Sequence, residues 1–396
     1  MSQVVLLNNT SYDVTELEQN LQRGIDLLGG WEQWLRPGMR VLLKPNLISP
    51  LPPEAAATTH PELVRALTRL LKKQGCEVWI GDSSGGAIIG RAVTAQTLKI
   101  TGMEQVAAEE GAIIKNFDRH GTVPVQTGSE QILPTLHIAK PIREADFVIN
   151  LPKLKTHMAA TYTGAIKNLF GCIPGLRKAE LHRLAPNQES FAQILLAINR
   201  ACNIGLHIMD GIVAMEGAGP TAGSPRQVGA VLISPDALAL DTVATKLIGI
   251  EPAKIPSLAV ARAQNFGEGD LEKITLLGDQ FSFPAVNDFN IPPGVPERSQ
   301  TLFSFNYILH LLKTRPVIDK KSCKHCNICV GSCPVNAINK KTKNIDYTVC
   351  IECLCCHELC PQKAVQIKHT HFLGPTLLAI SNSGRKLYSK WVGRRQ

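Results

Sequence analysis

Long apolar runs are absent from this chain of 396 residues. No stretch of about 18 apolar residues occurs, which excludes a conventional membrane-spanning helix. The N-terminal segment lacks the basic start of a signal peptide, so we expect a cytoplasmic location. The Walker phosphate loop, the G-x-S-x-G elbow and the H-E-x-x-H zinc motif are absent as well. Their absence argues against P-loop nucleotide hydrolases, α/β-hydrolases and zincin proteases.

Acidic residues are missing from the C-terminal part of the chain. Positions 361–396 hold seven lysines and arginines but no aspartate or glutamate, whereas the net charge of the whole chain is +9. The basicity therefore belongs to a tail, which argues against a nucleic-acid-binding protein. Because Tyr388 and Trp391 lie among these charges, the tail is also typical of peripheral contact with an anionic membrane. The alternative is a helix that docks on this protein or on a partner.

Cysteine is present in two ordered runs near the C-terminus. Both runs read C-x2-C-x2-C-x3-C-P, which is the ligand spacing of a module with two [4Fe–4S] clusters. In this pattern the cysteine before proline binds the cluster of the other run. One cluster is therefore predicted on Cys323, Cys326, Cys329 and Cys360. The other is predicted on Cys350, Cys353, Cys356 and Cys333.

The two runs belong to an internal repeat of 27 residues. Ile318-Asp319 before the first run matches Ile345-Asp346 before the second, and Ala337-Ile338 matches Ala364-Val365. A period shared by ligands and flanking residues argues for a duplicated module. Residues 315–369 resemble the bacterial-type two-cluster ferredoxin domain. The resemblance implies a small α+β fold that transfers electrons.

Two alternatives apply to these cysteines. A pair of structural zinc sites is one, but zinc motifs usually space their cysteines differently. Disulfide bonds are the other, but three cysteines within seven residues cannot pair among themselves without strain. The additional Cys355 occupies the position of Ile328 in the first repeat, and we interpret it as a buried, unreactive thiol rather than a ligand.

The rest of the chain alternates strand-like and helix-like segments. Examples are the strand at 40–44, the helix at 61–73 and the strand at 76–80. This alternation predicts an α/β fold, with a mostly parallel sheet and helices on both faces. The predicted parts are an α/β domain at 1–281, a linker and docking helix at 282–314, the ferredoxin domain at 315–369 and a basic tail at 370–396.

Polar residues directly follow several predicted strands. Ligands of parallel α/β sheets bind beyond the carboxyl ends of the strands. The ligand-binding candidates are therefore Lys44, Asn46, Asp82, Lys153, Asn168, Asp210 and Glu216. Asp210 and Glu216 are candidates for a shared divalent metal. The alternative is a turn aspartate beside a solvated glutamate.

The segment 150–175 is densest in candidate residues. Its lysines, placed at strand ends and near glycine turns, suit an anionic ligand such as a carboxylate or phosphate. The catalytic candidates are Lys155, His157 and Lys167. His157 could act as a general acid or base or as a metal ligand, although a lone histidine is more often structural. His182 lies in a predicted loop and is not among the candidates.

Short segments of the large domain resemble a known family. They read VLLKPNL, GDSSGG, NLPKLKTH, TGAIKNLFG, DGIVAMEGAGP and DALALD. Over residues 40–245 the chain resembles the domain of unknown function 362, whose members often carry a C-terminal two-cluster ferredoxin module. The resemblance implies an architecture and no substrate.

Three functions fit these observations. In an iron–sulfur oxidoreductase, electrons pass between the clusters and a small anionic ligand, or a further metal or organic cofactor, in the α/β domain. In an electron carrier, the α/β domain docks a redox partner protein, and the basic tail steers an acidic partner. In the third case the clusters are structural or sensory. The fusion of a ferredoxin to a domain with polar strand ends favours the first.

Overall fold

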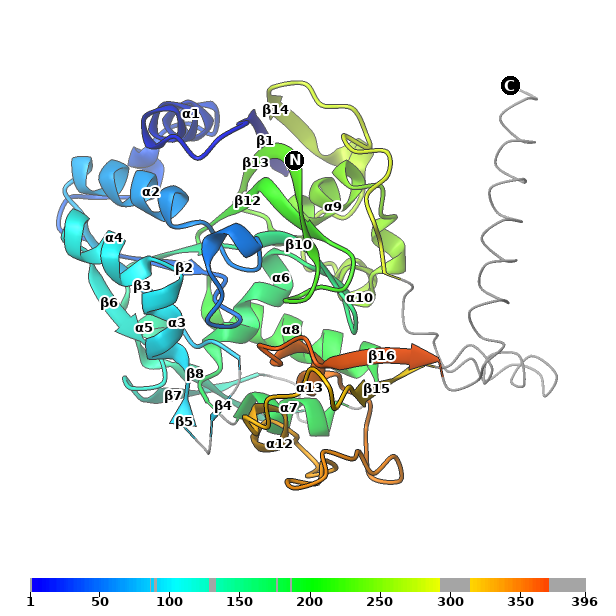
Figure 1. Cartoon of the computed structure of the whole chain (residues 1–396). Helices are drawn as coiled ribbons and strands as arrows, with labels where there is room; N and C mark the ends of the chain where they lie inside the picture. Colours follow the sequence, from blue (N-terminus) through cyan, green and yellow to red (C-terminus); the bar gives the residue numbers. More distant parts are fainter. Residues whose placement is uncertain are drawn as a thin grey trace, which may run out of the picture.

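The computed structural model contains a large α/β domain and a small C-terminal module (Figure 1). The described residues are 2–85, 87–88, 91–127, 133–175, 177–185, 187–292 and 314–369. Most of the predicted linker and docking helix, and the predicted basic tail at 370–396, lie outside these ranges.

One mixed sheet organises the α/β domain. Its strands follow the order β14-β1-β13-β12-β9-β2-β3-β6, and β10 and β11 pair beside β12. The bounds are β1 Gln3–Asn8, β2 Arg40–Pro45, β3 Glu77–Asp82, β6 Ile113–Asn116, β9 Phe147–Leu151, β10 Lys153–His157, β11 Thr161–Thr163, β12 Leu206–Glu216, β13 Ser224–Ser234 and β14 Thr275–Gly278. Most neighbouring pairs are parallel, whereas β13 is antiparallel to β1 and β12, and β11 to β10. The predicted mostly parallel α/β sheet is confirmed.

Helices and small hairpins surround this sheet. The α-helices are α1 Val14–Leu27, α2 Pro61–Lys73, α3 Thr94–Ile100, α4 Met103–Glu110, α5 Lys140–Glu144, α6 Ala165–Asn168, α7 Arg177–Leu184, α8 Gln188–Cys202, α9 Ala237–Leu247 and α10 Pro256–Ala263. The 3-10 helices are η1 Trp31–Gln33, η2 Pro53–Ala55, η3 Leu169–Cys172, η4 Pro252–Lys254 and η5 Leu271–Lys273. The hairpins pair β4 Ala87–Ile88 with β5 Arg91–Ala92, and β7 Thr122–Gln126 with β8 Thr135–Ala139.

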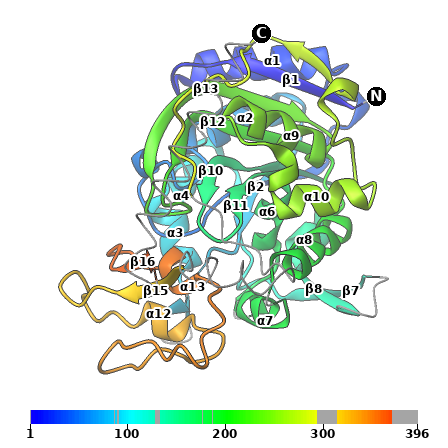
Figure 2. The same ribbon diagram turned by 90° about the vertical axis from the view of Figure 1, so that its right-hand side faces the viewer.

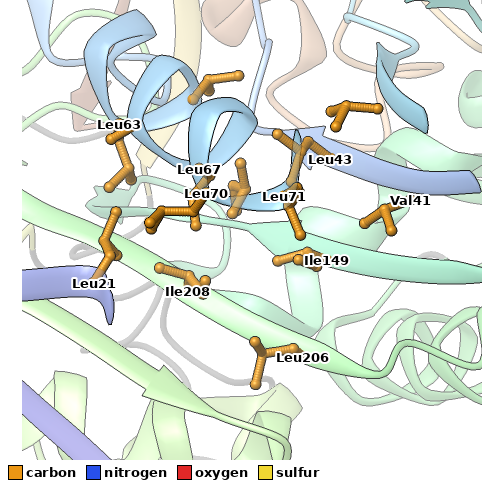
Figure 3. Packing of buried hydrophobic residues seen from close by; sticks show 14 of the residues in the cluster. Leu21, Val41, Leu43, Leu63, Leu67, Leu70, Leu71, Ile149, Leu206 and Ile208 are labelled. Atoms are coloured by element: carbon orange, nitrogen blue, oxygen red, sulfur yellow. The ribbon is translucent and has the colours of Figure 1, made fainter. Parts of the chain in front are cut away.

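Both faces of the sheet are buried. Alternate residues of a strand point to opposite sides of the sheet, so each strand contributes side chains to both cores. Val5 and Leu7 of β1 join the core beneath α1 and α2, whereas Val4 and Leu6 join the core beneath α9. Helix α2 begins at Pro61, after the cap at His60, and carries apolar residues at every third or fourth position. Figure 3 shows the packing of Leu63, Leu67, Leu70 and Leu71 against Val41, Leu43, Ile149, Leu206 and Ile208.

The C-terminal module repeats its backbone with the period of its sequence. It consists of β15 Thr314–Ile318, α12 Ile328–Gly331, α13 Cys355–Glu358 and β16 Val365–His369. Left-handed backbone conformations recur 27 residues apart at His325 and Glu352, at Asn327 and Leu354, and at Asn336 and Lys363. Strands β15 and β16, from opposite ends of the module, pair antiparallel and close it.

The second half of the module contacts the α/β domain. The hydroxyl of Thr221 donates a hydrogen bond of 2.8 Å to the carbonyl of Glu358. The side chain of Leu359 lies so close to Gly85 that a Cβ there would be 2.7 Å from its Cδ2. The module is therefore attached through the segment between Cys356 and Cys360, and its helix α12 also contacts β4.

Candidate functional site

A cavity of about 500 Å³ lies between the α/β domain and the module. On the α/β side it is lined mainly by Asn46, Asp82, Ser83, Asp118, Lys155, Thr163, Lys167, Asn168, Phe170, Arg177, Lys178 and His182. On the module side it is lined by Ser332, Cys355, Glu358 and Leu359. The volume is in the range of small-molecule sites in proteins.

The ends of β2 and β3 form one wall of this cavity. The two strands are parallel neighbours, so the residues that follow them meet at the same edge of the sheet. Lys44 is buried behind the wall and forms an ion pair of 2.8 Å with Asp82. Asp82 also accepts hydrogen bonds of 2.9 Å from the N–H groups of Leu47 and Ser83. This charge pair therefore holds the two strand ends in place.

A chain of buried amides leads to the cavity. Asn168 donates to Asn150 and accepts from Asn46, both over 2.7 Å. The amide nitrogen of Asn150 lies 3.0 Å from Nδ1 of His207. Within the described residues, Oδ1 of Asn46 is buried and has no hydrogen-bond partner. This row of amides therefore ends at Asn46, which lines the cavity.

Two lysine side chains line the cavity. Lys155 is buried, and its ammonium group donates to the carbonyls of Ala57 and Pro220. Burial, and then the neighbouring charge of Lys167, lowers the pKa of Lys155 well below its usual value. Burial also lowers the pKa of Lys167, whereas Glu358 opposes this shift. Among the described residues, no hydrogen bond or ion pair engages Lys167.

His157 connects the α/β domain to Glu358 of the module. Its Nδ1 accepts hydrogen bonds of 3.1 Å from the N–H groups of Ala159 and Ala160, so the ring proton belongs on Nε2. Nε2 lies 3.1 Å from Oε1 of Glu358, at an angle unsuited to a hydrogen bond. Burial lowers the pKa of His157 to about 4. Burial alone would raise the pKa of Glu358, but His157 and Lys167 lower it below its usual value.

Helix α7 closes the cavity on a third side. Lys178 donates to the carbonyl and hydroxyl oxygens of Ser83, over 2.7 and 2.6 Å, and burial lowers its pKa to about 8. His182 stacks on Phe191, with ring centroids 4.6 Å apart, and burial lowers its pKa to about 4. The predicted loop around His182 is wrong, since these residues are helical and the histidine lines the cavity.

The cluster cysteines line two further small cavities in the module. One is lined by Cys323, Cys326, Cys329 and Cys360, and the other by Cys333, Cys350, Cys353 and Cys356, together with Cys355. These are the two sets that the motif spacing predicts. The sulfurs of Cys333 and Cys360 each accept an N–H group over 3.2 Å, from Ala337 and Ala364 respectively. Thiolate donors with such N–H groups suit iron–sulfur clusters.

Cys355 is buried between the second cysteine set and the large cavity. A hydrogen bond with Cys353, followed by burial, raises the pKa of its thiol well above the usual value. A thiol with a raised pKa is a poor nucleophile, which agrees with the interpretation of an unreactive residue.

Two candidates, Lys153 and Asp210, face away from the cavity. Lys153 forms a buried ion pair of 2.7 Å with Asp210. Asp210 also accepts hydrogen bonds from the hydroxyl of Tyr12 over 2.7 Å and from the N–H of His60 over 2.9 Å. Glu216, at the far end of β12, instead accepts from the N–H of Asn290. The structure does not bring the two carboxylates together, and in its described part no three His, Cys, Asp or Glu side chains are placed to hold a single metal ion.

Replacing Asp210 with asparagine should destabilise the α/β domain by about 3–5 kcal/mol, because the buried ammonium of Lys153 loses its counter-charge. Asp146→Asn is the matched control. Asp146 pairs with Arg40 at the surface, where the two side chains are 38% and 45% exposed, and its loss should cost about 1 kcal/mol or less. Urea unfolding followed by tryptophan fluorescence gives both free energies. Equal losses in the two variants would show that the buried pair contributes no more than a surface pair.

Several residues at the cavity were not candidates from the sequence. Glu358 is the most informative of them, because the first repeat has Gly331 at the matching position. Comparing the two repeats would have revealed that the second carries an acidic residue between two cluster ligands. Lys178 and Asp118 gave no such signal, since they meet only after the chain folds.

Comparisons with known proteins identify both parts of the chain. The family described as "Domain of unknown function (DUF362)" matches residues 41–246, and the "4Fe-4S dicluster domain" matches residues 315–361. Thylakoid-associated protein sll1697 of Synechocystis is 38% identical over 258 residues, which make up 65% of this chain and 77% of that protein. Both resemblances predicted from the sequence are confirmed.

Shorter matches concern the module alone. Dihydromethanopterin reductase (acceptor) of Methanosarcina mazei is 44% identical over 54 residues, or 12% of this chain and 23% of the reductase. Pyruvate synthase subunit PorD of Methanothermobacter marburgensis is 39% identical over 54 residues, or 14% of this chain and 65% of that subunit. The dicluster domain and these similarities support iron–sulfur clusters and an electron-transfer role.

Solved structures give a weaker likeness. The lactate racemase apoprotein from Thermoanaerobacterium thermosaccharolyticum aligns over 62% of this chain and 56% of that chain, with a TM-score of 0.38 and 15% identity. A likeness of this size does not bear on function. None of the helices in the described part of this chain has the length and apolar content to cross a bilayer.

Proposed function

Because the chain belongs to the DUF362 family and carries a 4Fe–4S dicluster domain, we propose that it is an iron–sulfur oxidoreductase that acts on a small anionic molecule in the interdomain cavity. When bound, the two clusters supply one-electron transfer to or from that molecule. The chain's own residues shape the cavity, bind the anion and exclude bulk water.

One observation carries this proposal. Cys355, Glu358 and Leu359, from the segment that binds the second cluster, line the same cavity as Lys155 and Lys167 of the α/β domain. A molecule in this cavity is therefore in contact with the cluster-binding segment. A domain that only docked a partner protein would not need an internal cavity at this junction.

Charge and hydrogen bonding support an anionic ligand. Lys167 makes no hydrogen bond or ion pair among the described residues, although the carboxylate of Glu358 acts on its charge, and Lys155 contacts only carbonyl oxygens there. Arg177, on the rim, donates to the hydroxyl of Thr122 over 2.9 Å and keeps further donors for a ligand. A carboxylate or phosphate would satisfy these groups.

We also propose that the protein is cytoplasmic and touches a membrane surface peripherally through its basic tail. The tail lies outside the described residues, and its composition supports the proposal. The similarity to a protein named as thylakoid-associated supports it as well.

Ligand-induced stabilisation tests the proposed site. Carboxylated and phosphorylated metabolites would be screened for a rise in melting temperature under anaerobic conditions, with neutral analogues as controls. Since a ligand stabilises only the state that binds it, active anions should stabilise the wild type and fail to stabilise Lys167→Met. Equal stabilisation of Lys167→Met would place the ligand elsewhere.

A further inference from the structure

The two halves of the cysteine module carry very different charges. The first repeat has Lys320, Lys321 and Lys324 where the second has Tyr347, Thr348 and Ile351. Over residues 315–369 there are nine lysines and arginines against four aspartates and glutamates. The excess positive charge therefore belongs mainly to one half of the module.

These lysines lie around the first cysteine set. Lys324 lines the same small cavity as Cys323, Cys326, Cys329 and Cys360. Cys326 is exposed at the surface, as are Lys320, Lys321 and Lys324. Asp319 is the acidic residue next to them, and its carboxylate is engaged by the Ser322 hydroxyl over 2.7 Å and the Lys321 N–H over 3.1 Å. It neutralises only part of the local charge.

A neighbouring turn adds further positive charge to this surface. The side chain of Lys343 is buried, lines the same small cavity, and donates to Asn327 over 2.8 Å. This bond fixes the turn 339–344 against the first cysteine loop. Lys340 and Lys341 of the turn are exposed. We define the lysine face as Lys320, Lys321, Lys324, Lys340 and Lys341.

The second half of the module contacts the α/β domain, which α12 of the first half also reaches at β4. Glu358 contacts His157 and Thr221 there, and Leu359 contacts Gly85. The two cysteine sets therefore differ in surroundings: one borders the internal cavity, and the other opens to solvent beneath a basic surface.

We infer that the lysine face is the docking surface for an acidic one-electron carrier protein. In each encounter the reduced carrier loses one electron, and the cluster on Cys323, Cys326, Cys329 and Cys360 gains it. A group of exposed charges of one sign attracts a partner of opposite charge and accelerates its association. The inference does not depend on which molecule the cavity binds.

A redox protein fits this surface better than a membrane does. The lysines surround an exposed cluster ligand, and a carrier that docks over Cys326 has the short path that electron exchange requires. Binding to an anionic lipid surface requires basic residues, but it does not require an iron–sulfur cluster among them. Binding to anionic vesicles is therefore kept as an outcome of the test.

Charge reversal at the lysine face provides the test. The variant is Lys320→Glu/Lys324→Glu, and the control is Lys72→Glu/Lys254→Glu, which changes the net charge equally. Lys72 is on α2 and Lys254 precedes α10, and both are exposed. Figure 2 shows α10 well separated from α12 and β15. Iron and sulfide contents must equal those of the wild type in both variants.

Flavodoxin serves as the acidic probe and cytochrome c as the basic one. Calorimetry at low ionic strength measures the affinity for oxidised flavodoxin. Stopped-flow absorbance measures the rate at which reduced flavodoxin reduces the protein. We expect Lys320→Glu/Lys324→Glu to lower both the affinity and the bimolecular rate by about ten-fold or more, and added salt to remove the difference. Reaction of the reduced variant with cytochrome c should instead become faster.

Three results would overturn the inference. One is an unchanged flavodoxin affinity and rate in Lys320→Glu/Lys324→Glu. Another is an equal loss in the control variant, which would indicate a general charge effect. The third is a loss of binding to phosphatidylglycerol vesicles with flavodoxin binding intact, which would identify a membrane surface. If the reversal variant lacks clusters, Lys320→Gln/Lys324→Gln replaces it, with a smaller expected loss in the same direction.

Discussion

Replacing Cys333 with alanine is expected to remove the cluster of the second cysteine run, although Cys333 belongs to the first run. The physical reason is the crossed ligand set, since Cys333 lines one small cavity with Cys350, Cys353 and Cys356. Anaerobically purified protein should fall from about eight iron atoms to about four, with a matching loss of sulfide. Cys355→Ala, a neighbouring thiol outside both sets, should retain about eight.

Double variants identify which cluster has been lost. Cys333→Ala/Cys350→Ala removes two ligands of the same cluster and should retain about four iron atoms, like Cys333→Ala alone. Cys333→Ala/Cys323→Ala removes one ligand from each cluster and should retain almost none. The reverse pattern would mean that each run binds its own cluster. Zinc without labile sulfide in the wild type would contradict the iron–sulfur assignment altogether.

Replacing Lys167 with methionine is expected to lower the rate of electron exchange with the small-molecule substrate by about a hundred-fold or more. Lys167 lines the cavity and has no hydrogen bond or ion pair in the described part of the chain, so its charge is available to the ligand. Methionine has a similar length and removes only the charge. An ionic hydrogen bond to a bound anion is worth about 1.5–3 kcal/mol, and more where the site excludes water.

Two controls accompany Lys167→Met. Lys254→Met removes a surface lysine and should leave the rate unchanged. Reduction of Lys167→Met by dithionite should match that of the wild type, because the substitution leaves both cysteine sets intact. A full rate with the substrate in Lys167→Met would mean that the cavity does not recognise the anion through this residue.

The sequence predicts the fold well because the signals for it are local. Two cysteine runs with one spacing predict both ligand sets without knowledge of the fold. Alternating strands and helices likewise predict the parallel sheet, and with it the edge where Asn46 and Asp82 meet.

It is harder to predict which residues line the cavity, because this depends on contacts between residues that are distant in the sequence. Lys153 and Lys155 are two positions apart on β10, yet one pairs with Asp210 and the other faces the cavity. No local pattern distinguishes them. Glu358 reaches His157 only because the module docks with its second half against the α/β domain. Which half of the module docks depends on packing between residues that are far apart in the sequence.

The central claim is that the cavity holds the molecule that exchanges electrons with the clusters. It is tested most directly by reducing the protein anaerobically, removing the reductant, and following the return of cluster absorbance. Separated small-molecule and protein fractions of a cell extract would be added to the wild type and to Lys167→Met. The account predicts that the small-molecule fraction reoxidises the wild type much faster than Lys167→Met. Reoxidation by the protein fraction alone, at equal rates in both, would contradict it and favour an electron carrier with a docking domain.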